Sequence, residues 1–261
     1  MQHLLFDLPK PIIFAHRGSS TYAPENTLAA FELALKQGAP AIELDAKLTF
    51  DEEVVVIHDP TTQRTCGVNG TVKTMTLHQI KQLDAGSHFD TTFTGEKIPT
   101  LQEVFDLVGK KLLINIEITN YTSLFDNLPN KIAELVKKNK LEQWVFFSSF
   151  NPIALWKIKK LLPEIPIGFL AEEGKPGKLA RSKFFEWLKY QAFHPHYADV
   201  NLYLVQYHHQ KRRLINVYTV NQAEVMRSLH QMNVDGIFTD DPLLAQQVLQ
   251  PEQLSEKSKR P

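Results

Sequence analysis

The chain has 261 residues, of which 43% are hydrophobic, and its 29 basic and 29 acidic residues leave a formal net charge of zero. This balance excludes a basic field that could hold nucleic acid or anionic lipid by electrostatics alone, so we expect neither nucleic-acid binding nor stable membrane association. The single cysteine, Cys66, excludes an internal disulfide framework, and the first residues do not resemble a secretory signal, so we expect a cytoplasmic protein.

Short β-rich runs alternate with amphipathic stretches along most of the chain. The pattern predicts strands at residues 11–15, 41–48, 112–118, 144–149, 165–170, 190–194, 214–220 and 235–239. Helices are predicted between them, among others over 24–38, 151–162, 221–232 and 240–249, the first with Pro24 and Glu25 at its N-terminus and the others with Asn or Asp as caps. Eight such units in about 250 residues favour an α/β fold of the (β/α)8 TIM-barrel class. A doubly wound open sheet is the alternative.

One segment interrupts this alternation. After the second strand, a turn at 50–53 leads into a second apolar run, VVVI, which predicts a hairpin. Residues 59–98 then follow, rich in Thr and Gly, with one short helix predicted over 76–83. Long insertions at one end of a barrel often cover an active site. We therefore expect a single domain over 1–250 that carries a small inserted cap at about 59–98, and a flexible tail at 251–261.

Carboxylates gather on one face of two predicted strands. Glu43, Asp45 and Lys47 share one parity of the second strand, and Glu117 has the polar parity of the third. Helices pack on the outer face of a barrel, so the charged parity points inward. Three inward carboxylates cannot all ionise close together without a cation, and ligands that are all oxygen suit Mg²⁺ or Ca²⁺. The alternative is a structural ion pair, for which Lys47 lies on the correct face.

Two histidines lie at strand ends beside these carboxylates. His16 ends the first strand and His58 follows VVVI. Either alone could be a packing residue, but two such imidazoles can take a proton from a nucleophile and give one to a leaving oxygen. Arg17 is a planar donor that fits two phosphate oxygens. Together these residues indicate chemistry on an anionic phosphodiester.

An ordered set of short motifs extends through the chain: HRG (16–18), PENT (24–27), ELD (43–45), HD (58–59), LDAG (83–86), IPTL (98–101), IEI (116–118), SSF (148–150), TVN (219–221) and DGIFTDDP (235–242). In order and spacing, this set resembles the glycerophosphodiester phosphodiesterases, over about residues 11–249. HRG or HD alone would be weak, whereas the ordered set is specific.

The resemblance implies a phospholipase-C-like phosphodiesterase barrel. It also implies metal-dependent hydrolysis of small-molecule glycerophosphodiesters, such as glycerophosphocholine and glycerophosphoethanolamine, to sn-glycerol 3-phosphate and an alcohol. Carried over by position, His16 and His58 are expected as general acid and base, and Arg17 as the phosphate contact. One Mg²⁺ or Ca²⁺ is expected on Glu43, Asp45 and Glu117, and the insertion is expected as a cap that helps to hold the glycerol end.

Two positions depart from the family pattern. Thr119 stands where the family usually has a phosphate-directed lysine, which predicts weaker phosphate binding or a shifted substrate preference. Lys47 could substitute in part, although its stem could equally reach solvent. Tyr218 stands where Trp is common, which keeps an aromatic wall for the glycerol carbons, and Phe150 is expected to add an apolar wall.

Other polar residues receive structural interpretations. Four histidines in helical or polar segments are expected to be solvated: His78, His208, His209 and His230. His194 fits packing and site lining equally well. We assign Asn26 to the helix start and leave Glu25 between that role and support of Arg17.

Two alternative functions stay open. One is a lysophospholipase D-like phosphodiesterase, which the lack of an amphipathic membrane-binding stretch disfavours. The other is a catalytically inactive ligand-binding barrel, in whose favour stands only the departure at Thr119. The sequence does not predict the oligomeric state.

Overall fold

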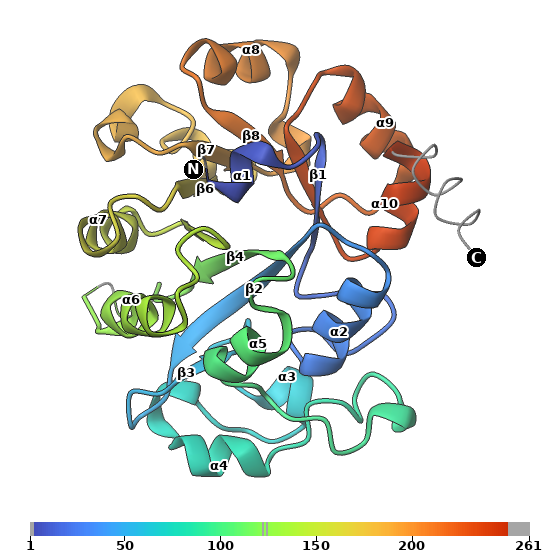
Figure 1. Ribbon diagram of the computed structural model, residues 1–261, viewed down its shortest axis with the longest axis vertical. Helices are drawn as coiled ribbons and strands as arrows, with labels where there is room; N and C mark the ends of the chain where they lie inside the picture. Colours follow the sequence, from blue (N-terminus) through green and yellow to red (C-terminus); the bar gives the residue numbers. More distant parts are fainter. Residues whose placement is uncertain (1–2, 122, 124, 250–261) are drawn as a thin grey trace.

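The computed structural model describes residues 3–121, 123 and 125–249, so the predicted tail at 251–261 lies outside the described residues. Eight parallel strands form a ring in the order β1-β9-β8-β7-β6-β5-β4-β2, which closes because β1 also pairs with β2 (Figure 1). Its strands are β1 (Ile12–Ala15), β2 (Ala41–Leu48), β4 (Leu113–Ile118), β5 (Val145–Ser149), β6 (Ile167–Ala171), β7 (Ala192–Pro195), β8 (Leu214–Val217) and β9 (Gly236–Thr239). The predicted TIM barrel is confirmed, and the open sheet is excluded.

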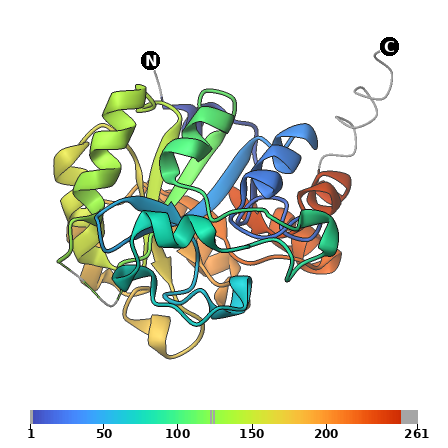
Figure 2. The same cartoon turned by 90° about the horizontal axis from the view of Figure 1, so that it is seen from below.

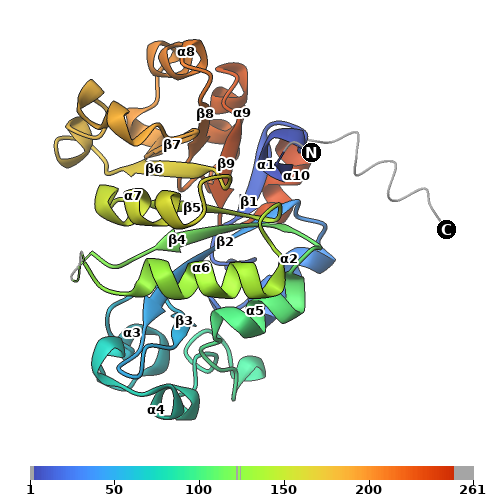
Figure 3. The same ribbon diagram turned by 60° about the vertical axis from the view of Figure 1, so that its left-hand side comes forward.

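Helices surround this ring on the outside (Figures 1 and 3). They are α2 (Leu28–Lys36), α5 (Leu101–Val108), α6 (Leu128–Asn139), α7 (Pro152–Leu161), α8 (Leu202–Gln210), α9 (Ala223–Gln231) and α10 (Pro242–Leu249). Between β6 and β7 the outer layer consists of the short 3-10 helices η3 (Pro176–Lys178) and η4 (Lys183–Leu188), and η5 (Tyr197–Asp199) precedes α8. At the amino ends of the strands, α1 (Leu4–Asp7) is held by His3, whose Nε2 lies 2.8 Å from the Val145 carbonyl at the start of β5.

The insertion after β2 forms a separate unit beside the carboxyl ends of the strands. β3 (Val54–Val56) pairs antiparallel with the last three residues of β2, as the hairpin prediction requires. The prediction of one short helix was incomplete, because four short elements follow: α3 (Gln63–Cys66), η1 (Val72–Thr74), α4 (Leu77–Gln82) and η2 (Thr91–Phe93). Figure 2 shows this cap lying across one side of the barrel. It has its own apolar cluster of Val55, Ile57, Val72, Ile80, Ala85 and Ile98.

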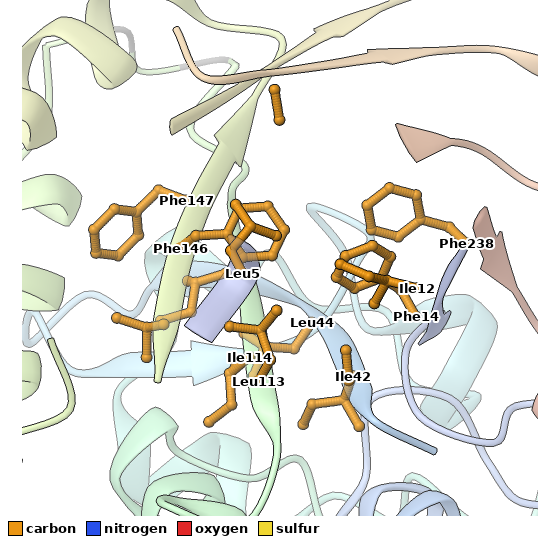
Figure 4. Packing of buried hydrophobic residues seen from close by; sticks show 14 of the residues in the cluster. Leu5, Ile12, Phe14, Ile42, Leu44, Leu113, Ile114, Phe146, Phe147 and Phe238 are labelled. Atoms are coloured by element: carbon orange, nitrogen blue, oxygen red, sulfur yellow. The ribbon is translucent and has the colours of Figure 1, made fainter. Parts of the chain in front are cut away.

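Aromatic rings fill the barrel interior. Phe14 of β1 stacks on Phe238 of β9 at 4.6 Å and lies 5.6 Å from Phe146 of β5, and the three rings face one another in Figure 4. Phe147, on the opposite parity of β5, points away from this cluster in the same view. Because these rings exclude water, they give the polar residues at the strand ends a dry floor.

His194 of β7 belongs to this interior, which decides between its two predicted roles in favour of packing. Its ring is fully buried, 5.0 Å from that of Phe238, and its Nε2 lies 3.3 Å from Asn216 Nδ2. Burial lowers its pKa to about 3, so it is neutral near pH 7. Gly168 of β6 makes room for the ring, since a Cβ there would lie 2.5 Å from His194 Nε2.

Two expectations about the first predicted helix, over residues 24–38, were wrong. The helix α2 begins at Leu28 rather than near Pro24, because the Thr27 side chain caps it by accepting a hydrogen bond from the Ala30 amide. Asn26 therefore does not start the helix. It has a left-handed φ of 57°, a conformation that asparagine tolerates better than most residues, and its side chain turns toward β2.

The prediction that His208 is solvated was also wrong. Its ring is 1% exposed and stacks on Phe193 at 4.3 Å, with neither ring nitrogen bonded to a described residue. Burial, together with nearby Arg213, lowers its pKa to about 3. His209 is exposed on the same helix but bonds Asp235 at 2.8 Å, while His78 and His230 are exposed as expected.

Replacing His208 by Phe is expected to stabilise the protein, and more so in acid. Between pH 6.5 and 3 the unfolded chain binds a proton at this histidine that the folded chain does not, so stability falls as pH falls through that window. Removing the ring nitrogens should add about 1 kcal/mol at pH 8 and about 2 kcal/mol more at pH 5. Thermal unfolding at both pH values measures this gain. Equal gains at the two pH values, or the same pattern from His230→Phe, would contradict the prediction.

The structure also bears on membrane insertion. Within residues 3–121, 123 and 125–249, no helix combines the length and the apolar character that crossing a bilayer requires.

Candidate active site

Three carboxylates meet at the carboxyl ends of β2 and β4. These strands are paired so that Asp45 lies opposite Glu117 and Glu43 opposite Asn115. One oxygen from each of Glu43, Asp45 and Glu117 lies within 4.8 Å of the others. Glu43 and Asp45 are 2% and 1% exposed. Strand parity thus brings together the predicted acidic residues, at a spacing at which one hard cation can contact all three, since such ions bind oxygen at about 2.0–2.6 Å.

The electrostatics of this acidic centre call for a cation. Burial and the charges of Asp45 and Glu117 raise the pKa of Glu43 well above its usual range. Burial and Asp45 likewise raise the pKa of Glu117 to about 8. Glu43 Oε1 is buried and, among the described residues, has no hydrogen-bond partner. An orphaned carboxylate oxygen beside two further carboxylates fits a Mg²⁺ or Ca²⁺ ligand set.

Arg17 holds two of these carboxylates. Its left-handed φ of 57° turns the chain after β1 so that its amide donates to Glu43 Oε2 at 3.0 Å. Its guanidinium lies 3.3 Å from Asp45 Oδ2 and donates to Glu25 at 3.0 Å. Although burial acts to raise the pKa of Asp45, Arg17 brings it below its ordinary value. The cation paired with Asp45 is therefore Arg17 rather than Lys47.

The two strand-end histidines face this centre, each tied to a carboxylate through Nδ1. His16 Nδ1 lies 2.7 Å from Asp240 Oδ1, and its Nε2 lies 4.0 Å from Glu43 Oε2. His58 Nδ1 lies 2.8 Å from Asp59 Oδ1. A carboxylate at Nδ1 favours the tautomer with the proton there, which leaves Nε2 free to accept one.

Both histidines, Arg17 and two of the three carboxylates line one pocket of about 190 Å³. Its polar wall contains His16, Arg17, Glu43, His58 and Glu117. Its apolar lining comes from Phe150, Leu170, Tyr218 and Phe238. The Tyr218 hydroxyl donates to the Ala171 carbonyl at 2.8 Å, so only its ring faces the pocket, and that ring meets Phe150 edge to face. The predicted residues Phe150 and Tyr218 thus lie where small carbon groups could pack.

Thr119 does not line this pocket. Its hydroxyl donates to the Ala46 carbonyl at 2.7 Å and accepts from Lys47 Nζ at 2.8 Å. The same ammonium also donates to the Thr119 carbonyl at 3.1 Å. Lys47 is therefore folded against Thr119 at the rim of the acidic centre, and the expectation that its stem could equally extend into solvent was wrong.

Arg64, on α3 of the cap, connects Glu25, which holds Arg17, with Asp59, which holds His58. Its guanidinium donates twice to Glu25 at 2.8 Å, and also to Asp59 at 2.7 and 3.2 Å. Glu25 holds Arg17, and Asp59 holds His58. The hydrogen bond from Arg64 is the main reason that the pKa of Asp59 falls to about 2, so this carboxylate stays ionised beside the imidazole.

Replacing Arg64 by Met is expected to lower kcat/KM by roughly 10- to 100-fold, the range seen when groups that orient site residues are removed. Arg64→Lys should restore part of the activity only, because an ammonium cannot make the paired, forked contacts to Glu25 and Asp59. The pH–rate profile should shift as well, since Asp59 would lose its cation. Arg227→Met, an exposed α9 arginine paired with Glu224 at 3.8 Å, is the matched control. A wild-type profile for Arg64→Met would contradict the role.

Several site residues escaped the sequence interpretation. Asn26 donates to Asp45 Oδ2 at 2.8 Å, and the Tyr121 hydroxyl donates to Glu117. Asn221 does not cap α9 as predicted, because its side chain donates to Asp240 at 2.5 Å and so supports the partner of His16. Asn26 belongs to the motif PENT and Asn221 to the motif TVN, and membership of these motifs was the feature of the sequence that could have marked them as site residues.

Known proteins are similar to this chain over most of its length. The model of a family described as the glycerophosphoryl diester phosphodiesterase family matches residues 16–244. A glycerophosphodiester phosphodiesterase of Caldanaerobacter subterraneus subsp. tengcongensis is 42% identical over 238 residues, which cover 89% of this chain and 95% of that protein. Another from Bacillus altitudinis is 35% identical over 236 residues, covering 88% and 94%.

Solved structures are similar as well. An Oleispira antarctica phosphodiesterase in complex with the product sn-glycerol-3-phosphate has a TM-score of 0.84 and 30% identity, with 94% of this chain and 98% of that chain covered. A glycerophosphodiester phosphodiesterase from Agrobacterium tumefaciens has a TM-score of 0.78 and 29% identity, with 89% and 97% covered.

Proposed function

The chain belongs to the glycerophosphoryl diester phosphodiesterase family, and from this premise we propose that it hydrolyses glycerophosphodiesters, such as glycerophosphocholine and glycerophosphoethanolamine, to sn-glycerol 3-phosphate and the free alcohol. One observation carries the proposal: an acidic centre and two carboxylate-oriented histidines face the same pocket. Water is consumed, and the phosphorus–oxygen bond to the alcohol breaks.

Glu43, Asp45 and Glu117 would hold one Mg²⁺ or Ca²⁺. When bound, the cation would neutralise charge that develops on the phosphoryl oxygens. The residues of the chain act around it. Arg17 has a guanidinium in the pocket wall, fixed by Glu25 and Asp45, and would donate to a phosphate oxygen.

The histidines would move the protons of the reaction. One imidazole takes the proton of the attacking oxygen at its Nε2, and the other gives a proton to the departing alcohol oxygen. Asp240 and Asp59 fix the Nδ1 side of each ring and so hold its orientation. His16 and His58 are the groups in the pocket wall suited to this exchange.

The glycerol arm of the substrate would lie against Phe150 and Tyr218. Both rings border the pocket beside the acidic centre, and carbon-bound hydrogens of a polyol pack well on aromatic faces. The structural neighbour from Oleispira antarctica is in complex with sn-glycerol-3-phosphate, which supports a small soluble substrate for this fold. The cytoplasmic location and the lack of stable membrane association stay predictions from the sequence.

A coupled assay for glycerol 3-phosphate release tests the proposal. Glycerophosphocholine and glycerophosphoethanolamine are each incubated with the enzyme in Mg²⁺ or Ca²⁺, and a chelator is then added. We expect release that depends on the metal and stops with the chelator. Faster turnover of lysophosphatidylcholine would favour the lysophospholipase D-like alternative, and no turnover of any diester would favour an inactive barrel.

A further inference from the structure

A second hollow, of about 180 Å³, lies at the carboxyl end of β8 and is called the β8 groove below. Its lining consists of Tyr197, Thr219, Val220, Asn221, Gln222 and Val225. Thr219 also lines the catalytic pocket of about 190 Å³, so both spaces border on this residue. Figure 1 shows β8 and α9 on the side of the barrel away from the cap helices α3 and α4.

Hydrogen bonds join the β8 groove to the wall of the catalytic pocket. The Tyr197 amide donates to the Tyr218 carbonyl at 2.8 Å, and Tyr218 lines the catalytic pocket. Asn221 donates to Asp240 Oδ2 at 2.5 Å, while Asp240 Oδ1 lies 2.7 Å from His16 Nδ1. A substrate whose phosphorus lies beside the histidines can therefore extend one arm into the groove.

A phosphodiester has two arms, and the β8 groove suits the arm that the catalytic pocket does not hold. The glycerol arm is proposed above to lie against Phe150 and Tyr218, inside the catalytic pocket. The alcohol that departs as the head group then needs a space of its own beside that pocket. The β8 groove offers this space, because the two hollows share Thr219.

The chemistry of the β8 groove favours a cationic head group. Its six lining residues, all of them described, carry no charge, and the Tyr197 side chain is partly exposed there. The carboxylate of Asp240 is bonded to the lining residue Asn221 and is 33% exposed. An ammonium group binds to an aromatic face and is attracted by a carboxylate, whereas an anionic head group is repelled by it.

We propose that the β8 groove is the head-group subsite and that it selects glycerophosphodiesters whose alcohol carries an ammonium group over those with an uncharged head group. The inference rests on the proposed function. It makes Tyr197 a specificity residue, because its ring contacts the ammonium. Gln222 is a second one, because its neutral amide leaves the groove open to a cation.

Glycerophosphocholine and its carbon isostere, in which a tert-butyl group replaces the trimethylammonium group, test the selection. For the wild-type enzyme we expect the ratio of the two kcat/KM values to exceed one in favour of glycerophosphocholine. Tyr197→Leu should lower this ratio roughly fivefold, the effect of losing one cation–π contact, whereas Tyr197→Phe should keep it. Any difference in reactivity between the two alcohols cancels when variants are compared. Tyr203→Leu, a 77% exposed tyrosine on α8, is the matched control and should keep the wild-type ratio.

A second variant places a charge in the β8 groove. Gln222→Lys should lower the ratio roughly threefold, because its ammonium repels the choline head group, and Gln222→Glu should raise it. Gln206→Lys, on α8, changes the net charge by the same amount and should keep the wild-type ratio. Gln222 and Gln206 are both exposed, so these changes do not threaten folding.

The outcomes distinguish the subsite from the reaction itself. A wild-type ratio of one or below, or a ratio that either Tyr197→Leu or Gln222→Lys leaves unchanged, would overturn the head-group subsite while release of glycerol 3-phosphate stands. Failure to release glycerol 3-phosphate from any diester would overturn the proposed function, and the subsite with it.

Discussion

Replacing Glu43 by Gln is expected to reduce turnover on the order of a thousandfold and, at the same time, to raise the melting temperature of the metal-free protein. The amide keeps the shape of the side chain, and its oxygen can still accept from the Arg17 amide. It removes a buried carboxyl whose pKa is raised well above its usual range by burial and by the charges of Asp45 and Glu117, so that its ionisation near neutral pH opposes folding without a cation. A gain of roughly 1–2 kcal/mol corresponds to a few degrees.

Thermal unfolding with and without Mg²⁺ or Ca²⁺ completes this test. The wild-type protein should melt at higher temperature as the cation is added, because binding to the folded state alone stabilises it. Glu43→Gln should lose most of that response. Glu53→Gln, an exposed carboxylate in the turn before β3, changes the same net charge and should leave activity and the metal response intact. A Glu43→Gln enzyme with wild-type turnover would exclude the acidic centre as the metal site.

Replacing His16 by Ala is expected to lower kcat by 10²- to 10⁴-fold, the usual contribution of a general acid or base. The imidazole is fixed between Asp240 at Nδ1 and the pocket at Nε2, so its loss removes a proton carrier without removing a metal ligand. The rise of the melting temperature with Mg²⁺ or Ca²⁺ should therefore persist. This combination separates a catalytic role from a structural one.

Asp240→Asn refines the role of His16. An amide can donate to Nδ1, which would move the proton to Nε2, so we expect a 10- to 100-fold loss and an altered pH–rate profile. His78→Ala, in the cap and exposed, is the matched control for the loss of a histidine. If His16→Ala keeps wild-type kcat, another group must carry the proton, and the two-histidine scheme is wrong.

Most of the barrel could be predicted from the sequence because its determinants are local. Alternation along β2 and β4 separates Ile42 and Leu44, which face the helices, from Glu43 and Asp45, which face inward, so the ring and its acidic centre follow from parity. The start of α2 was misplaced because PENT contains Pro24, and proline is common in the first turn of a helix. The side chain of Thr27, three residues later, caps the helix and decides the boundary.

The features that the sequence did not predict depend on contacts between distant segments, and such contacts leave no periodic pattern in the sequence. His208 reads as the end of a polar stretch, yet its place on α8 turns it onto Phe193. Arg64 lies on the four-residue helix α3, which no sequence pattern predicts, and only the folded cap brings it to Glu25, 39 positions away.

The strand β2 is continuous from the barrel into the cap, and this limits how the enzyme can move. Its first residues pair with β4, while Ala46–Leu48 pair with β3, and β3 is in turn bridged to Thr100, just before α5. The cap is thus tied at its entry to β2, the strand that carries Glu43 and Asp45, and at its exit to β3. From these two attachments we expect the cap to act as a fixed wall rather than a swinging lid, so that a diffusing substrate meets a mouth that is already shaped.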